Sequence, residues 1–422
     1  MTTVVEGVCL KVLASALACS PTLGSEGLVA YRTLEALREQ FCVETVTSAG
    51  MQTPRGVGTH AIDVQLDEPN DVGPASLFAY EMRQRSVVKR LLRGSQFHVL
   101  HRVTPSGYKD SLLAVPGIPL ILGPVLAADP PPDSFKAIFG PRLPRQFSLR
   151  TVRHRFGNGI ARRIFQRFST SSQLLQNAAL ILVGTEVTRR RLPEQLRARA
   201  RLITYAGVEY DQFTPPAAGR PPQVPRLLFA GRLVPYKGVE LLLRAAAVAR
   251  QRCAFRLTIV GRGFPPYVRY CRQLVADLNL GDLVTFVEHV PRDQLVEMYR
   301  ATDIFCMPSI ETYGIAILEA MSSGCAVLVA DANGPGEIVQ PGSGVKVRLE
   351  QPEQFIRDYA DRIAQLVGDT ALRRRLGGEA REHVTRHHDW KRIGNALREI
   401  YAEIACNPTQ QPASAPTLCR SS

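Results

Sequence analysis

Two carboxylates set eight residues apart give the clearest sign of chemistry in this sequence. Glu311 lies in a loop after an apolar run, and Glu319 lies in the helix that is predicted to follow. Eight residues span about two helical turns, so the two acids should lie roughly on one face. Backbone amides at the helix mouth lack intrahelical partners and carry the positive end of the helix dipole. These amides belong to Gly314, Ile315 and Ala316. Together these groups suit an anionic ligand that is rich in hydroxyls.

A second group of candidate ligands is basic. Arg232 and Lys237 follow the predicted strand Leu227–Ala230 and come just before a predicted helix. Cations placed beyond a strand end and beside a helix start can clamp a diphosphate. Gly261 follows the next predicted strand, Arg256–Val260, in a Gly-x-Gly turn. Such a turn alone is weak evidence, but its place between strand and helix favours a Rossmann-like nucleotide site.

Two further candidates lie in the first half of the chain. Gly24 and Ser25 occupy a glycine loop between a predicted strand and helix, where a backbone can approach phosphate closely. Most loops of this kind are only turns. His101 follows the predicted strand Phe97–Leu100, at the carboxyl end where α/β sheets bind ligands. From position alone, a histidine that hydrogen-bonds the backbone is the more common outcome.

The elements around these residues alternate between strand and helix, which predicts an α/β fold of two doubly wound, Rossmann-like domains. The 422 residues suit two or three domains. The first domain is expected over 1–213. A linker over 214–225 is indicated by five prolines and one glycine. The second domain is expected over 226–386, a terminal helix over 387–405, and a disordered polar tail over 406–422.

The motifs resemble those of the family 4 retaining glycosyltransferases, also called glycosyl transferases group 1. The sequence ETYGIAILEAMSSGCAVLVAD from Glu311 follows the family's Glu-x7-Glu signature, with Tyr313 where Phe is more common. FAGRLVPYKG from Phe229 resembles the family's donor-phosphate motif, and HRVTP from His101 resembles a subgroup. The resemblance is strong over residues 222–405 and looser over 1–215.

This resemblance implies the GT-B fold, in which two Rossmann-like domains face each other across a cleft and the terminal helix returns to the first domain. It implies transfer of a sugar from a nucleotide-diphosphate donor to a hydroxyl acceptor (a glycan, a glycolipid or a small molecule), with retention and without metal or another cofactor. Glu311 and His101 would contact the sugar, and Glu319 the ribose. Arg232, Lys237, Gly261, the helix-mouth amides, Gly24 and Ser25 would bind the rest of the donor.

Composition points to anionic partners, because the formal charge is +14. Residues 134–185 contain no acid and include eight arginines between Arg142 and Arg167. Within them, Phe156, Ile160, Ile164 and Phe168 are spaced as in an amphipathic helix. Such a helix suits an anionic membrane surface. A core-facing helix with a solvated basic face is the alternative. Nucleic acid is not expected as a partner.

The remaining features concern the compartment and metals. Nine scattered cysteines argue against a disulfide framework and fit a reducing cytosol. With no signal peptide evident, a cytoplasmic location is expected, either free or peripheral to the inner face of the membrane. His383, His387 and His388 match no known metal-ligand spacing, so no metal site is predicted.

Two other functions fit parts of the pattern. A nucleotide-sugar epimerase of the same architecture could use a similar donor site. A non-catalytic protein that binds sugar nucleotides would keep Arg232 and Lys237 as a diphosphate clamp but would not catalyse transfer. The basic and acidic motif residues are all present, which favours transfer. The sequence does not identify the sugar, the base or the acceptor.

Overall fold

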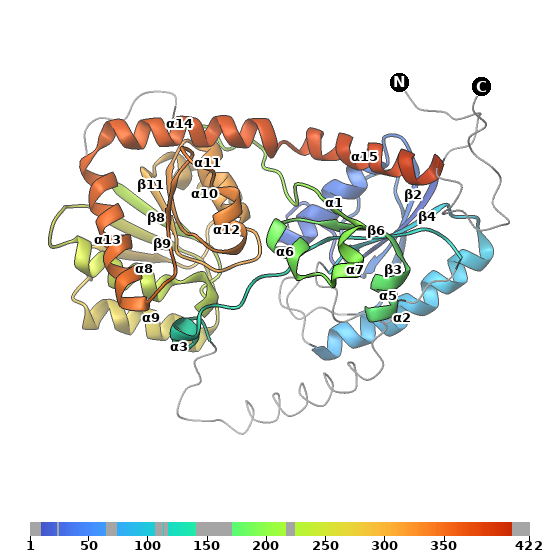
Figure 1. Cartoon of the computed structure of the whole chain (residues 1–422), viewed down its shortest axis with the longest axis horizontal. Coiled ribbons are helices and arrows are strands. Elements are labelled where there is room, and N and C mark those ends of the chain that lie inside the picture. The colour runs from blue at the N-terminus through green and yellow to red at the C-terminus, as the bar shows by residue number, and fades with distance from the viewer. Residues whose placement is uncertain are drawn as a thin grey trace. The chain divides into compact units, whose positions relative to one another are not determined.

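A computed structural model describes residues 10–22, 25–64, 74–105, 113, 117–140, 171–216 and 224–406 (Figure 1). The chain divides into two compact units. Unit 1 comprises 1–127, 146–206 and 390–422, and unit 2 comprises 128–145 and 207–389. Each unit is built on one parallel sheet, which confirms the expected α/β class.

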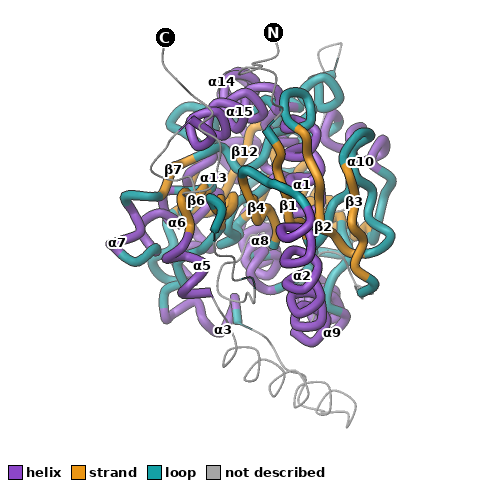
Figure 2. Tube along the Cα trace, turned by 90° about the vertical axis from the view of Figure 1, so that its right-hand side faces the viewer, coloured by secondary structure: helices purple, strands orange, loops and turns teal. Residues whose placement is uncertain are grey.

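Unit 1 holds a seven-stranded parallel sheet in the order β3-β2-β1-β4-β5-β6-β7. Strands β3, β2, β1 and β4 lie side by side in Figure 2. The strands are β1 (Lys11–Ala16), β2 (Cys42–Ser48), β3 (Gly58–Ile62), β4 (Val99–Thr104), β5 (Leu120–Val125), β6 (Ala178–Val183) and β7 (Ala200–Leu202). The sequence of strands reverses between β1 and β4, which is where α/β sheets open a crevice for ligands.

Helices cover both faces of this sheet. They are α1 (Ser25–Leu37), α2 (Pro74–Gly94), α5 (Ser171–Asn177), α6 (Glu186–Arg191), α7 (Glu194–Arg197) and α15 (Trp390–Cys406). Alternate side chains of each strand enter opposite cores. In β1, Val12 and Ala14 join α1 and α15 in one core, while Leu13 joins α2 and α5 in the other. The terminal helix therefore packs on unit 1, as the resemblance implied.

Unit 2 holds a six-stranded parallel sheet in the order β10-β9-β8-β11-β12-β13. The strands are β8 (Arg226–Ala230), β9 (Arg256–Val260), β10 (Val284–Val287), β11 (Ile304–Met307), β12 (Ala326–Ala330) and β13 (Val345–Val347). The order reverses between β8 and β11. The loops after these two strands carry the phosphate motif and the Glu-x7-Glu motif, so both motifs meet at one switch point.

The helices of unit 2 flank the sheet on both faces (Figure 1). They are α8 (Val239–Ala249), α9 (Pro265–Asp277), α10 (Arg292–Arg300), α11 (Ile315–Ser322), α12 (Asn333–Ile338), α13 (Pro352–Gly368) and α14 (Thr370–His387). Helix α8 is apolar on most of its surface and buries eight of its eleven residues, among them Val239, Leu242 and Ala246. Helix α13 packs against α8, and α14 packs against α11.

One segment departs from the expected domain boundaries. Residues 128–140 follow β5 of unit 1 but belong to unit 2. This segment, called the strap below, contains the short helices η1 (Asp133–Phe135) and α3 (Lys136–Phe139). It is fixed by Phe135, a fully buried ring that meets Phe355 of α13 edge-on at 6.0 Å between centroids. Burial of this aromatic ring places the strap in unit 2, although the chain that leads into it belongs to unit 1.

The expected linker also differs. Phe213 is buried in unit 2, and its carbonyl accepts a hydrogen bond from Ser322 Oγ at 2.7 Å. Thr214 Oγ1 accepts one from Arg300 at 2.8 Å. The segment before residue 217 is therefore docked on unit 2 and is not an extended linker. Residues 217–223 and the predicted tail over 407–422 lie outside the described residues.

Most cysteines in the described ranges are thiols. Cys19, Cys253, Cys271, Cys306 and Cys325 are free. Cys42 is disulfide-bonded, so the expectation of reduced cysteines fails at that position. Across the described ranges, none of the helices combines the length and apolarity needed to cross a membrane.

Candidate nucleotide-sugar site

Lys237 and Glu311 form the centre of the site in unit 2. Lys237 ends the short helix η2 (Pro235–Lys237) after β8, and Glu311 lies in the loop after β11. Their side chains form an ion pair, and both are largely buried, with exposed fractions of 11% and 14%. Ser309 Oγ donates a second hydrogen bond to Glu311 Oε1 at 3.1 Å. The structure thus brings together one cation and one acid that the sequence assigned to the donor.

Arg232 lies on the exposed side of the same loop. Its Nη2 donates to Tyr236 Oη at 2.6 Å, which orients the guanidinium near η2. An exposed, oriented guanidinium can give two parallel hydrogen bonds to a phosphate. The loop as a whole therefore presents two basic side chains at the switch point.

Gly261 serves the site through its backbone. A Cβ at this position would lie 1.9 Å from the carbonyl oxygen of Gly231, and the residue has φ of +145°. Only glycine fits at this position, because the Gly231 carbonyl leaves no room for a side chain and other residues avoid this φ. The amide of Leu233 donates to the carbonyl of Arg262 at 2.8 Å, so the loops after β8 and β9 are held together.

The mouth of α11 lies where the sequence predicted it, directly after the Glu311 loop. Gly314 caps the helix with φ of +136°, and the eight-residue helix begins at Ile315. The first amides of such a helix, at Gly314, Ile315 and Ala316, have no carbonyl behind them to accept their hydrogen bonds. A Cβ on Gly314 would be 3.5 Å from Glu311 Oε1, which places the Glu311 carboxylate beside this mouth.

Glu319 is buried further along α11. Tyr299 Oη donates to Glu319 Oε2 at 3.0 Å, and Arg292 Nη1 lies 3.8 Å from Oε1. Burial raises the pKa of Glu319 from 4.5 to about 7, although Arg292 and the tyrosine bond act in the opposite direction. Tyr299 and Arg292 thus each lie against one oxygen of the Glu319 carboxylate.

Arg292 is a site residue that the sequence analysis did not identify. It begins α10, forms an ion pair with Glu209, and lies over the Phe213 ring at 5.1 Å from the centroid. Its position after the His289-Val290-Pro291 loop was the available signal. Its approach to Glu319 depends on tertiary packing, which no local pattern encodes.

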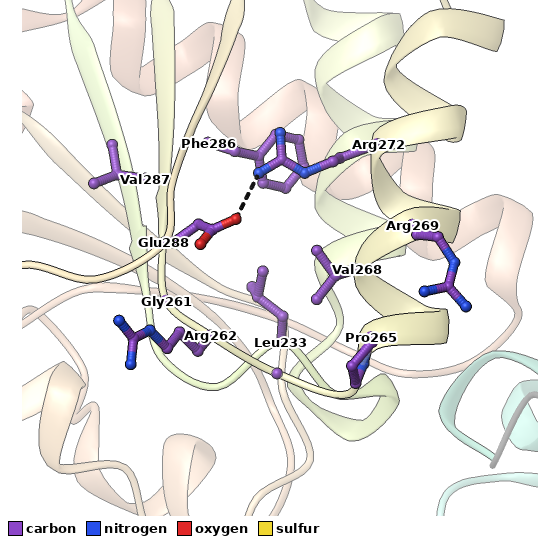
Figure 3. Close-up of a pocket in the computed structure, with 11 residues that line it drawn as sticks. Leu233, Gly261, Arg262, Pro265, Val268, Arg269, Arg272, Phe286, Val287 and Glu288 are labelled. Atoms are coloured by element: carbon purple, nitrogen blue, oxygen red, sulfur yellow. Dashed lines mark ion pairs between the residues drawn. The ribbon is translucent and has the colours of Figure 1, made fainter.

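A pocket of about 380 Å³ opens beside these loops. It is lined by Gly261, Arg262, Val268, Arg272, Phe286 and Glu288, among others. Figure 3 shows Arg272 reaching across the Phe286 ring toward Glu288. The guanidinium lies 5.0 Å from the ring centroid, and Arg272 Nη2 lies 3.6 Å from Glu288 Oε1. His289, the next residue after Glu288, is not part of the lining.

His101 is placed differently from the expectation. It lies inside β4 and is fully buried. Nε2 donates to the carbonyl of Gly123 at 2.6 Å, and Nδ1 accepts from the hydroxyl of Tyr401 in α15. Burial lowers its pKa from 6.5 to about 4, so the ring is neutral. With both nitrogens engaged inside the core, the expected contact between His101 and a sugar is not supported.

Two other predictions concern residues near the ends of helices. Gly24 lies outside the described residues, and Ser25 is described only as the first backbone position of α1.

His383, His387 and His388 do lie near one another. Nδ1 of His388 is 3.3 Å from the Tyr313 hydroxyl. Over the part of the chain that the structure describes, no group of three or more potential ligands could hold a metal ion.

Comparison with solved structures defines the fold class. The chain is similar to sucrose-phosphate synthase from Thermosynechococcus elongatus, with a TM-score of 0.68, 19% identity, and coverage of 94% of this chain and 99% of that one. It is also similar to the Anabaena protein HepE in complex with UDP, with a TM-score of 0.63, 16% identity, and coverage of 93% and 100%. The chain therefore has the GT-B fold.

Sequence comparison finds similarity to one family. Residues 211–383 match the family model described as Glycosyl transferases group 1. A D-inositol 3-phosphate glycosyltransferase from Nocardia farcinica is 32% identical over 227 residues, which cover 52% of this chain and 46% of that protein. The chain thus spans about half the length of this curated relative.

Proposed function

We propose that the protein transfers a glycosyl group from a nucleotide-diphosphate sugar to a hydroxyl acceptor. The observation that carries this proposal is the Lys237–Glu311 pair beside the mouth of α11, at the switch point of the sheet. A cation and helix amides suit the diphosphate. A carboxylate suits the hydroxyls of a sugar. The site therefore offers matched groups for both ends of the bond that would break.

The donor would divide among the groups of unit 2. Lys237, Arg232 and the amides of Gly314–Ala316 would bind the diphosphate. Lys237 would exchange part of its contact with Glu311 for phosphate, leaving Glu311 to accept hydrogen bonds from sugar hydroxyls. Glu319 would accept from the ribose. The pocket at Gly261 and Phe286 has the volume and aromatic wall to hold a base.

The chemistry would require little from side chains beyond charge placement. As the sugar–phosphate bond breaks, negative charge grows on the departing diphosphate, where Lys237 and Arg232 would stabilise it. The departing phosphate would accept the proton of the acceptor hydroxyl. This scheme predicts retention of anomeric configuration and activity without metal. His101 has no direct part in it.

The acceptor is expected to be hydroxyl-rich and, given the charge of +14, anionic. D-inositol 3-phosphate, the acceptor in the name of the relative described above, has these properties and is the first to test.

We further propose that the protein works in the cytoplasm, in peripheral contact with anionic membrane. Most of the stretch 134–185 lies outside the described residues. Helix α2 offers support, since its outer face carries basic side chains (Arg83, Arg85, Lys89, Arg90 and Arg93), while its acid Glu81 is buried against Arg102.

The experiment measures nucleoside diphosphate release and sugar transfer with uridine and guanosine donors, with and without acceptor and in the presence of EDTA. A glycosyltransferase gives acceptor-dependent release and a glycosylated product. An epimerase changes the donor without needing acceptor, and a binding protein shows a thermal shift without turnover. Loss of transfer in EDTA would contradict metal independence, and inversion at the anomeric carbon would contradict retention.

A further inference from the structure

The loop that carries Glu311 is held by the first two residues of α12. Asn333 Nδ2 donates to the carbonyl of Ile310 at 2.9 Å, and the amide of Gly334 donates to the carbonyl of Glu311 at 3.2 Å. Two consecutive carbonyls are thus fixed at the residue that would contact the sugar. The position of the Glu311 carboxylate depends on these bonds as well as on its pair with Lys237.

The backbone of α12 is shaped for this contact. Asn333 has φ of +47°, a left-handed conformation that asparagine tolerates better than most residues. A Cβ on Gly334 would lie 2.3 Å from Cα of Tyr313, so no side chain fits there. These features bring the start of α12 directly against the Glu311 loop.

Asn333 also binds the strap. Its Oδ1 accepts from the amide of Asp129 at 2.7 Å, and its Nδ2 donates to the carbonyl of Asp129 at 3.2 Å. The side-chain amide therefore makes three hydrogen bonds, and the residue is buried at 8% exposure. At its other end, the strap places α3 against η2, which carries Lys237. Within unit 2, one segment thus adjoins both the clamp and the Glu311 loop.

We propose that Asn333 is a positioning residue for sugar transfer, which ties the strap to the loop of Glu311 and sets the place of that carboxylate. This inference rests on the proposed function. It assigns Asn333 no contact with the donor. Its effect should fall mainly on the sugar step, because Arg232 and Lys237, the two cations expected to bind the diphosphate, lie on the loop after β8. A buried amide with three partners is costly to disturb.

Asn333→Asp is the sharpest variant. Aspartate keeps the size, the tolerance for the left-handed backbone, and the oxygen that accepts from Asp129. It removes the Nδ2 donor and places a charged oxygen toward the carbonyls of Ile310 and Asp129. Asn279→Asp is the matched control, since Asn279 also has a left-handed φ of +53° but is exposed beyond α9.

The measurement pairs transfer rate with affinity for free nucleoside diphosphate. Asn333→Asp should lose at least about tenfold in transfer rate and keep diphosphate affinity within about threefold, while Asn279→Asp should change neither. Wild-type transfer by Asn333→Asp would overturn the proposal. Equal losses of rate and affinity would also overturn it, because they would indicate general damage to the clamp.

Hydrogen exchange tests the tie without any turnover. In Asn333→Gly, which keeps the backbone conformation and removes all three bonds, residues 128–139 and 308–314 should both exchange faster, with α13 unchanged. If neither variant folds, nucleoside diphosphate added to the wild type should slow exchange in both segments together. A change in only one segment would overturn the tie. Because the exchange of Asn333→Gly needs neither donor binding nor transferase activity, failure of the proposed function remains distinguishable from failure of this inference.

Discussion

Lys237 and Glu311, 74 residues apart in the chain, form an ion pair at the switch point of the second sheet. The pair exists because β8 and β11 are neighbours, so that the loops after them meet. Both side chains are largely buried, and each limits the desolvation cost of the other. Replacing one of these contacts by a donor phosphate or a sugar hydroxyl would keep both groups satisfied.

Lys237→Gln should weaken binding of nucleoside diphosphate by roughly 1.5–3 kcal/mol, because a charged hydrogen bond to phosphate is lost and Glu311 is left without its cation. Isothermal titration calorimetry measures this directly. Lys346→Gln is the control, because Lys346 pairs with Asp331 at 3.3 Å beside β13. Equal affinity for Lys237→Gln and wild type would remove the lysine from the clamp.

Glu319 should make stability depend on pH. Its folded-state pKa of about 7 lies above the ordinary value of 4.5, so the native state holds the proton more tightly than the unfolded state does. The free energy of unfolding should therefore fall by up to about 3 kcal/mol as pH rises from 4.5 to 7. Arg292, Tyr299 and Glu209 are the ionisable groups that act on it.

The check compares denaturant unfolding of wild type and Glu319→Gln at several pH values. Their difference in free energy should move in favour of the variant between pH 4.5 and 7 and stay level above 8. A difference that does not vary over this interval would show that Glu319 keeps an ordinary pKa.

Gly261→Ala should destabilise unit 2 by roughly 2–4 kcal/mol, because the new Cβ would collide with the Gly231 carbonyl in a backbone conformation that alanine avoids. Gly281→Ala is the matched control, since a Cβ there would meet nothing within 4 Å. Thermal unfolding compares the two. Equal melting temperatures would mean that the loops after β8 and β9 can separate without cost.

His101→Ala should act on stability and spare the chemistry. The variant leaves a cavity and deprives Tyr401 and the Gly123 carbonyl of their partner, at a cost of roughly 2–4 kcal/mol. The transfer rate per folded molecule, with folded protein quantified after gel filtration, should stay within about threefold of wild type. A loss of transfer of about a hundredfold at unchanged stability would restore a direct role for this histidine.

The sequence predicted the positions of the motif loops well because the pattern that defines each loop is local. Strand, glycine turn and helix follow one another within a few residues around Lys237 and around Glu311, and the alternation of the elements implies that parallel strand ends meet. The order of β8 and β11 in the sheet then follows from the doubly wound topology. These parts of the site needed no knowledge of distant packing.

The failures have physical causes. The strand before His101 was expected to end at Leu100, whereas β4 continues to Thr104, so the histidine lies within the sheet and faces α15. The strap was assigned to the first domain by chain order, but burial of Phe135 against Phe355 fixes it to the second. The approach of Arg292 to Glu319 and the bonds of Asn333 likewise join segments that are distant in sequence.

Glu311→Gln tests the central claim most directly, because it keeps the shape of the side chain and removes the charge expected beside the sugar. The measurement pairs the affinity for free nucleoside diphosphate with the transfer rate from the same donor. The variant should bind the diphosphate within about threefold of wild type and lose transfer by about a hundredfold or more, equivalent to about 2.7 kcal/mol of barrier. Full transfer by Glu311→Gln would show that the sugar does not bind at the Lys237–Glu311 pair.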